Sequence, residues 1–121
     1  MKLIIAGSRN VTEYDELKHA IVNLSIVIHD VTEVVSGGAR GADALGEKFA
    51  KEYNIPLKIF PANWDKHGKS AGYIRNAEMA KYADTLLALW DEESRGTKHM
   101  IDLMSKEKKK TYVYVVKKEQ S

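Results

Sequence analysis

The sequence predicts an α/β protein with three layers, in which about five parallel strands form a sheet and helices cover both of its faces. Short apolar runs alternate with amphipathic segments along the chain, and these runs are continuous, as is typical of strands buried on both sides. A parallel strand needs a crossover helix to reach its neighbour. With 121 residues, 44% of them hydrophobic, we expect one domain over residues 1–121.

The first half of the chain predicts two strands and two helices. Residues 2–6 are apolar and end at a glycine, which indicates a buried strand, and residues 33–36 indicate a second one. Thr12 is a candidate N-cap for the first helix, with an acidic residue three positions later. The second helix is expected over residues 42–53. The apolar stripe of the first helix consists of Leu17, Ala20, Ile21 and Leu24.

The second half predicts three strands, over residues 57–60, 85–90 and 111–116. Residues 63–72 are polar and read as an unusually long loop, a feature that is often functional in a compact domain. A helix should follow over residues 73–82. Another, capped by Thr97, has its expected core positions at Met100, Ile101, Leu103 and Met104.

Polar and glycine-rich segments follow three of these strands, over residues 7–10, 37–43 and 91–97. In an open parallel sheet, ligands bind beyond the carboxyl ends of the strands, near the point where the strand order reverses. We therefore expect the three segments to converge on one edge and form a binding site.

The segment after the second strand carries the most specific motif. It places three glycines and an arginine before a helix, where backbone N–H groups and a guanidinium suit a phosphate. It matches neither the Walker A pattern nor the dinucleotide fingerprint. The alternative is a tight turn in which Asp43 complements the helix dipole. The candidate residues are Ser36, Gly37, Gly38, Ala39, Arg40, Gly41 and Asp43.

Other candidates lie at the same edge. After the first strand, a backbone cradle, a hydroxyl and a guanidinium would come from Gly7, Ser8 and Arg9. The third long helix and the fourth contribute Arg75, Asn76, Gly96 and Thr97. Arg75 reads equally well as a solvated helix charge, and Thr97 as a plain helix cap.

Composition excludes several classes of function. The chain has no cysteine, which excludes disulfides, Cys–Zn sites and a thiol nucleophile. Its four histidines lack metal-ligand spacing, and no cofactor or metal is evident besides a nucleotide-derived ligand. No apolar run reaches the roughly 18–20 residues of a membrane span, and no signal peptide is recognisable, so we expect a cytoplasmic protein without a membrane partner. Trp64 could stack on a base or pack as a lid.

The net charge of +2 is a property of one end of the chain. Residues 105–121 hold six lysines and two glutamates, a net charge of +4, which leaves residues 1–104 at −2. Such a body offers a poor track for a nucleic-acid backbone, so nucleic-acid binding is the minority interpretation. The lysine-rich end is most simply the solvated end of a helix.

Together, the segments at 7–9, 36–43, 75–76 and 94–97 resemble the SLOG superfamily, the Rossmann-like group that includes DprA and the LOG proteins, and look closest to its small YspA-like branch. The resemblance implies a Rossmann-like domain, a nucleotide or nucleotide-derived ligand at these loops, and a homo-oligomer. We expect the protein to sense, sequester or process that ligand.

Two relatives imply different alternatives. LOG proteins are phosphoribohydrolases, and their catalytic arginine corresponds to Arg75. Their catalytic glutamate corresponds to Met100, which cannot act as a carboxylate, and Asp91 or Glu92 would be the nearest substitutes in sequence. DprA-like proteins bind single-stranded DNA, and their SGxARGxD segment is similar to residues 36–43. Whether the protein is an enzyme therefore stays open.

Overall fold

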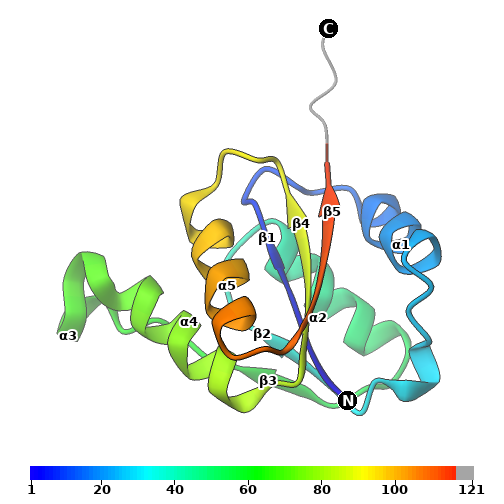
Figure 1. Cartoon of the computed structure of the whole chain (residues 1–121), viewed down its shortest axis with the longest axis horizontal. Coiled ribbons are helices and arrows are strands. Elements are labelled where there is room, and N and C mark those ends of the chain that lie inside the picture. The colour runs from blue at the N-terminus through cyan, green and yellow to red at the C-terminus, as the bar shows by residue number, and fades with distance from the viewer. Residues whose placement is uncertain (117–121) are drawn as a thin grey trace, which may run out of the picture.

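The computed structural model describes residues 1–116 and contains a five-stranded sheet (Figure 1). All neighbouring strands are parallel, in the order β3-β2-β1-β4-β5. The α/β class and the parallel sheet predicted from the sequence are confirmed. The strands are β1 (Lys2–Gly7), β2 (Glu33–Ser36), β3 (Leu57–Ile59), β4 (Thr85–Trp90) and β5 (Lys110–Val115).

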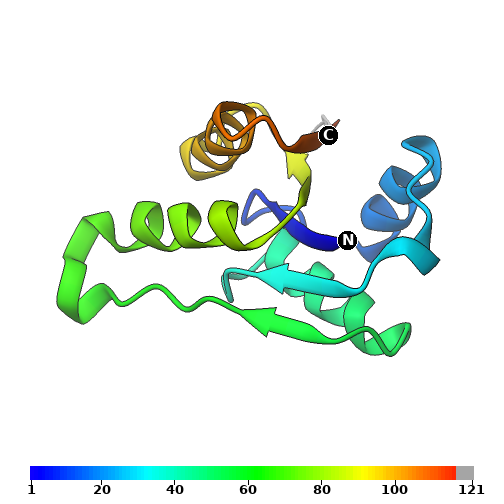
Figure 2. The same ribbon diagram turned by 60° about the horizontal axis from the view of Figure 1, so that its bottom comes forward.

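Helices cover both faces of the sheet, which gives the expected three layers (Figure 2). One face carries α1 and α2, and the other carries α4 and α5. The helices are α1 (Tyr14–Asn23), α2 (Ala42–Glu52), the short α3 (Trp64–His67), α4 (Ala71–Tyr82) and α5 (Arg95–Lys106), with 3₁₀ turns at η1 (Ile28–Asp30) and η2 (Gly68–Ser70).

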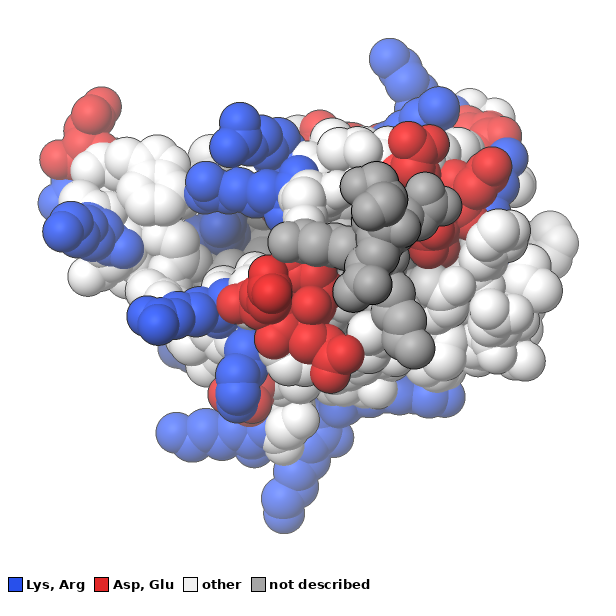
Figure 3. Space-filling model, turned by 90° about the horizontal axis from the view of Figure 1, so that it is seen from above, with Lys and Arg blue, Asp and Glu red and all other residues white. Residues whose placement is uncertain are grey.

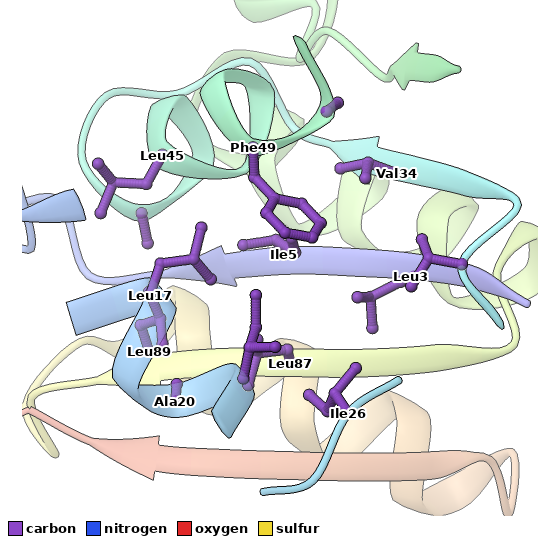
Figure 4. Close-up of a cluster of buried hydrophobic side chains, with 14 of the residues drawn as sticks. Leu3, Ile5, Leu17, Ala20, Ile26, Val34, Leu45, Phe49, Leu87 and Leu89 are labelled. Atoms are coloured by element: carbon purple, nitrogen blue, oxygen red, sulfur yellow. The ribbon is translucent and has the colours of Figure 1, made fainter. Parts of the chain in front are cut away.

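The three central strands are buried on both faces because their successive side chains point to opposite layers. In β1, Leu3 and Ile5 pack with the α1–α2 layer (Figure 4), whereas Ile4 and Ala6 pack with the α4–α5 layer. The edge strands are more open, and Ile59 of β3 is 42% exposed. The core therefore forms around β2, β1 and β4, and the edges lie next to solvent.

Two helix caps differ from the predictions. Helix α1 begins at Tyr14 and follows Glu13, with no side-chain cap, so Thr12 is not its N-cap. Helix α5 begins at Arg95, and the hydroxyl of Ser94 accepts a hydrogen bond from the backbone N–H of Thr97. Thr97 therefore lies inside the helix that it was expected to cap. The expected core of α5 is half right, because Met100 and Met104 are buried while Ile101 and Leu103 are only partly buried.

The expected loop over residues 63–72 is also wrong, because most of it is helical. The side chain of Asn63 accepts a hydrogen bond from the backbone N–H of Lys66 and caps α3. Gly68 ends that helix with a φ of 56°. Helix α4 then begins at Ala71, which is buried. We call residues 61–70, which extend beyond the body of the sheet, the arm (Figures 1 and 2).

The lysine-rich end is described only in part. Lys106 closes α5, and Lys110 begins β5 rather than continuing the helix. Lys117 and Lys118 lie outside the described residues. None of the helices within residues 1–116 has the length and apolar character needed to cross a bilayer.

Candidate functional site

The strand order reverses beside β1, because the chain leaves β3 through α4 and returns as β4 on the other side of β1. A cavity of about 440 Å³, which we call the first cleft, lies beyond the carboxyl ends of these two strands. Its walls come from the loops after β1 and β4, the start of α2, the side of α4 and the start of α5. This is where an open parallel sheet places a ligand.

A second cavity of about 530 Å³ adjoins the first cleft on the side of the arm. The loop after β2, the edge strand β3 and the arm form its walls. Arg9, Ala39 and Arg75 line both cavities. These three residues therefore mark the junction of the two spaces.

The structure brings most of the predicted site residues together. Those lining the first cleft are Gly7, Ser8, Arg9, Ala39, Asp43, Arg75, Asn76, Gly96 and Thr97. Gly37, Gly38 and Arg40 line only the second cavity. Ser36 and Gly41 line neither space. The Ser36 hydroxyl donates a 2.8 Å hydrogen bond to Glu47, and Gly41, at a φ of 80°, lies against the backbone of Arg9.

Arg75 has a defined orientation at the junction. Its Nε donates to the side-chain oxygen of Asn76 at 3.0 Å, and its Nη1 donates to the carbonyl of Gly37 at 2.5 Å. A Cβ atom at position 37 would lie 2.5 Å from that Nη1 and 2.9 Å from the carboxylate of Asp43. Glycine at position 37 therefore leaves room for a guanidinium and a carboxylate to approach the backbone from the same side.

The carboxyl group of Asp43 is nearly buried in the wall of the first cleft. Burial raises its pKa from 3.8 to about 6, because a charged carboxylate loses its hydration there. The backbone N–H of Ala39 donates to it at 3.2 Å, and the charge of Arg75 also opposes the increase. Asp43 consequently changes its protonation state around pH 6.

Arg9 brings a second positive charge close to Arg75. Burial lowers the pKa of the Arg75 guanidinium, the charge of Asp43 opposes this, and the charge of Arg9 lowers it further. Two guanidinium groups therefore repel each other at the point where the cavities meet. A bound anion would remove that repulsion.

Several backbone amides of the glycine loops already donate within the protein. The N–H of Ser8 donates to Leu89, that of Gly38 to the Ser36 hydroxyl, and that of Ala39 to Asp43. These hydrogen bonds to protein acceptors therefore stabilise the turns. The positively charged side chains at the junction are those of Arg9 and Arg75.

Two hydrogen-bond networks connect the loops of the first cleft. The Ser8 hydroxyl accepts from the backbone N–H of Asp91, whose carboxylate accepts in turn from the N–H of Ser94. On the other side, the Asn76 amide donates to the carbonyl of Gly96 at 3.3 Å and lies 3.3 Å from His99 Nδ1. The geometry of the cleft is therefore set before any ligand enters.

Several lining residues were not predicted from the sequence. Asn10 follows a predicted site residue directly, and Ser94 belongs to the segment that carries the resemblance, so both could have been found from their positions. Met79 and the second-cavity residue Glu47 lie on helix faces with no motif. Met100 lines the first cleft, so the position corresponding to the LOG glutamate does face it.

No metal centre is evident within residues 1–116, where no three His, Asp or Glu side chains gather as metal ligands would. His99 instead packs edge-on against Tyr73, with 4.6 Å between the ring centres. Burial lowers the pKa of His99.

Figure 3 views the carboxyl edge of the sheet from above. Lys and Arg side chains surround the hollow between the arm and the body, and an acidic group lies beside it. The positive charge at this edge is thus local, on a body whose first 104 residues carry a net charge of −2.

Comparison with known proteins identifies a relative of this chain. The gene 61 protein of Mycobacterium phage D29 is 42% identical over 72 residues, which cover 54% of this chain and 58% of the phage protein. The chain thus matches less than two thirds of that relative's length. No solved structure matches the chain.

A family model described as YAcAr, "YspA, cpYpsA-related SLOG family", matches residues 1–67. The matched part contains Arg9 and the loop after β2, whereas Arg75 and Asn76 lie beyond it. It covers more than half of the chain, and the predicted resemblance is confirmed. The chain belongs to the YspA, cpYpsA-related SLOG family.

Proposed function

We propose that the protein binds a phosphorylated nucleotide or a nucleotide-derived ligand at the carboxyl edge of its sheet. The ligand's phosphate lies between Arg9 and Arg75, and its sugar enters the first cleft. Binding of this kind serves to sense, sequester or process the ligand. Membership of the SLOG family supports a nucleotide-related role.

The observation that carries this proposal is the pair of like charges at the junction. Arg75 is held by Asn76 and Gly37, and Arg9 is close enough to lower its pKa. Guanidinium groups bind phosphate through several charge-assisted hydrogen bonds. In the first cleft, the side-chain oxygens of Asn76 and Thr97 can accept hydrogen bonds from the hydroxyls of a ribose.

A thermal-shift screen with AMP, ADP, ADP-ribose, NAD and cyclic dinucleotides tests the proposal. A ligand present at one hundred times its Kd stabilises the folded state by about 2.7 kcal/mol. Arg9→Ala should reduce affinity roughly tenfold or more, because it removes charge-assisted hydrogen bonds. Arg95→Ala is the matched control, since Arg95 is exposed at the same edge and lines neither cavity. The proposal fails if no nucleotide raises the melting temperature, or if the two variants behave alike.

Asp43 favours a second candidate function, cleavage of an N-glycosidic bond. Its buried carboxyl lies in the first cleft and titrates at a pKa of about 6, so it is largely ionised at neutral pH. Arg75 would hold the phosphate while the bond between C1′ and the base breaks. Water would supply hydroxide to C1′, and its proton would pass through Asp43 to the departing base.

Chromatographic detection of free base from a nucleoside monophosphate tests this second candidate. The rate should rise with pH through about 6, as Asp43 loses its proton. Asp43→Asn should abolish base release while nucleotide binding remains. If no nucleotide that binds is cleaved, hydrolysis is excluded and binding stands alone.

A further inference from the structure

Trp64 is the feature of the second cavity that the phosphate site does not explain. It begins α3 on the arm, and its side chain is 52% exposed although it lines the cavity. Tryptophan is the largest side chain available for burial, and most of its stabilising effect comes from being buried. An indole left half in solvent beside a cavity is therefore available to a ligand.

The indole of Trp64 and the guanidinium of Arg75 approach the same point. A Cβ atom at position 72 would lie 3.6 Å from Trp64 Cη2 and 3.7 Å from Arg75 Nη2. Because residue 72 is a glycine, no side chain of its own lies between Trp64 and Arg75. Because Arg75 uses Nε and Nη1 for Asn76 and Gly37, its Nη2 is on the side that faces the arm.

The rest of the second cavity suits a flat apolar ring. Ile59, Pro61 and Ala62 line it together with Trp64, and Arg40 adds a guanidinium. Ile59 is 42% exposed. An aromatic base gains from stacking on an indole and from contact with aliphatic walls, whereas an inorganic anion has no flat apolar face to stack.

From this arrangement we propose that Trp64 forms a stacking platform for the base of the nucleotide, in the second cavity. This inference rests on the proposed function and assigns each part of the nucleotide to a part of the site. The base stacks on Trp64, the phosphate lies between Arg9 and Arg75, and the sugar or a second group extends into the first cleft. The ligand is therefore a free nucleotide that carries an aromatic base, and a phosphosugar alone occupies only part of the site.

The competing occupant is single-stranded nucleic acid, whose bases also stack on aromatic side chains. A nonspecific nucleic-acid site requires a basic groove that continues along the backbone. Here the first 104 residues carry a net charge of −2, and acidic groups lie among the basic side chains on this face (Figure 3). This favours one nucleotide over a strand.

The test compares a ligand that has a base with one that lacks it. Calorimetric titration would measure the affinity for AMP, ADP or ADP-ribose, whichever gives the largest thermal shift, and for ribose 5-phosphate. Trp64→Ala should weaken nucleotide binding by roughly 5- to 100-fold, the usual effect of losing one stacked aromatic. It should leave the affinity for ribose 5-phosphate unchanged, and Trp64→Phe should restore most of the nucleotide affinity.

Tyr53→Ala is the control, because Tyr53 is an exposed aromatic at the far end of α2 that lines neither cavity. Circular dichroism would confirm that each variant folds. Indole fluorescence gives a second measurement of binding, made only on the variants that fold. The nucleotide should quench the wild type, and Trp64→Phe, which keeps only Trp90, should lose that quenching.

The outcomes separate the two proposals. If Trp64→Ala binds nucleotides as tightly as the wild type while Arg9→Ala does not, the platform is refuted and the phosphate site stands. If no nucleotide binds the wild type, both proposals fail. A Trp64-dependent affinity for an oligo(dT) strand that exceeds the affinity for every free nucleotide, and falls steeply with salt, would overturn the assignment to a free nucleotide.

Discussion

The first cleft and the second cavity share two arginines, yet their walls are built differently. Several polar side chains of the first cleft, such as Asn76 and Ser8, are buried and hydrogen-bonded to neighbouring segments. The second cavity has half-exposed apolar side chains from an edge strand and the arm, such as Ile59 and Trp64. A change to one of these buried groups should therefore alter stability together with binding, whereas one in the second cavity should alter binding alone.

The largest expected effect is at Gly7, on the floor of the first cleft. A Cβ atom there would lie 2.0 Å from the carbonyl oxygen of Leu89 and 2.9 Å from Ala42 Cβ. Because backbone and a buried helix cannot move aside, Gly7→Ala should lower the free energy of unfolding by about 4 kcal/mol or more, or prevent folding. Urea denaturation measures this.

Gly96→Ala is the matched control in the same cleft. Nothing lies within 4 Å of its added methyl group, and the position is in the first turn of α5. The free energy of unfolding of Gly96→Ala should stay within about 1 kcal/mol of the wild-type value, and any change should be an increase. Equal effects of the two substitutions would contradict the close packing inferred at Gly7.

A pH effect from Asp43 comes next. Burial raises its pKa to about 6 in the folded state, so between pH 4 and 6 the folded chain binds a proton that the unfolded chain has released. This contribution to stability is complete below the unfolded pKa near 4 and is lost as pH rises through about 6. The loss should amount to roughly 2–3 kcal/mol.

Urea denaturation of the wild type and Asp43→Asn from pH 4 to 7.5 isolates this effect, because the other acidic groups titrate in both proteins. As pH rises, the free energy of unfolding of the wild type should fall relative to that of Asp43→Asn. A difference that stays constant over this range would show that the carboxyl group titrates normally.

Asn76 should have an intermediate effect. Asn76→Ala removes the acceptor of Arg75 Nε and the donor to the carbonyl of Gly96. Loss of a buried hydrogen-bonding group should cost about 1–3 kcal/mol of stability, and nucleotide affinity should fall because Arg75 is no longer oriented. If stability falls while affinity is unchanged, Asn76 has only a structural role.

The smallest effect on stability is expected at Trp64. Because its side chain is 52% exposed, Trp64→Ala should reduce the free energy of unfolding by at most about 1 kcal/mol. Thermal denaturation without nucleotide measures this. A loss comparable to that of Asn76→Ala would mean that Trp64 holds the arm to the body, and the contrast between the two cavities would disappear.

Sequence patterns were reliable where burial determines structure. The apolar runs identified all five strands, and they were most continuous in the central strands, because a strand buried on both faces must be apolar on both. Local capping was less predictable. Ser94 and Thr97 are equally suited to cap α5, and the turn held by the Asp91 carboxylate determines which one does. That contact is not visible in a pattern of residue types.

The prediction of a loop over residues 63–72 failed for a different reason. Residues 63–72 lack a long apolar stripe, so they resemble a loop. Their helices form nevertheless, because Asn63 caps α3 and Ala71 is buried at the start of α4. Short helices depend on such contacts more than on periodicity.

By itself, the sequence determined the parallel three-layer fold and the edge at which the polar loops meet, because strand burial and connection rules follow from residue order. Only the tertiary structure decided that Arg9 and Arg75 meet at a junction, that loop amides donate inside the protein, and that Asp43 is buried. These properties depend on distances between segments far apart in the chain. Hydration and charge interaction respond to such distances and not to sequence spacing.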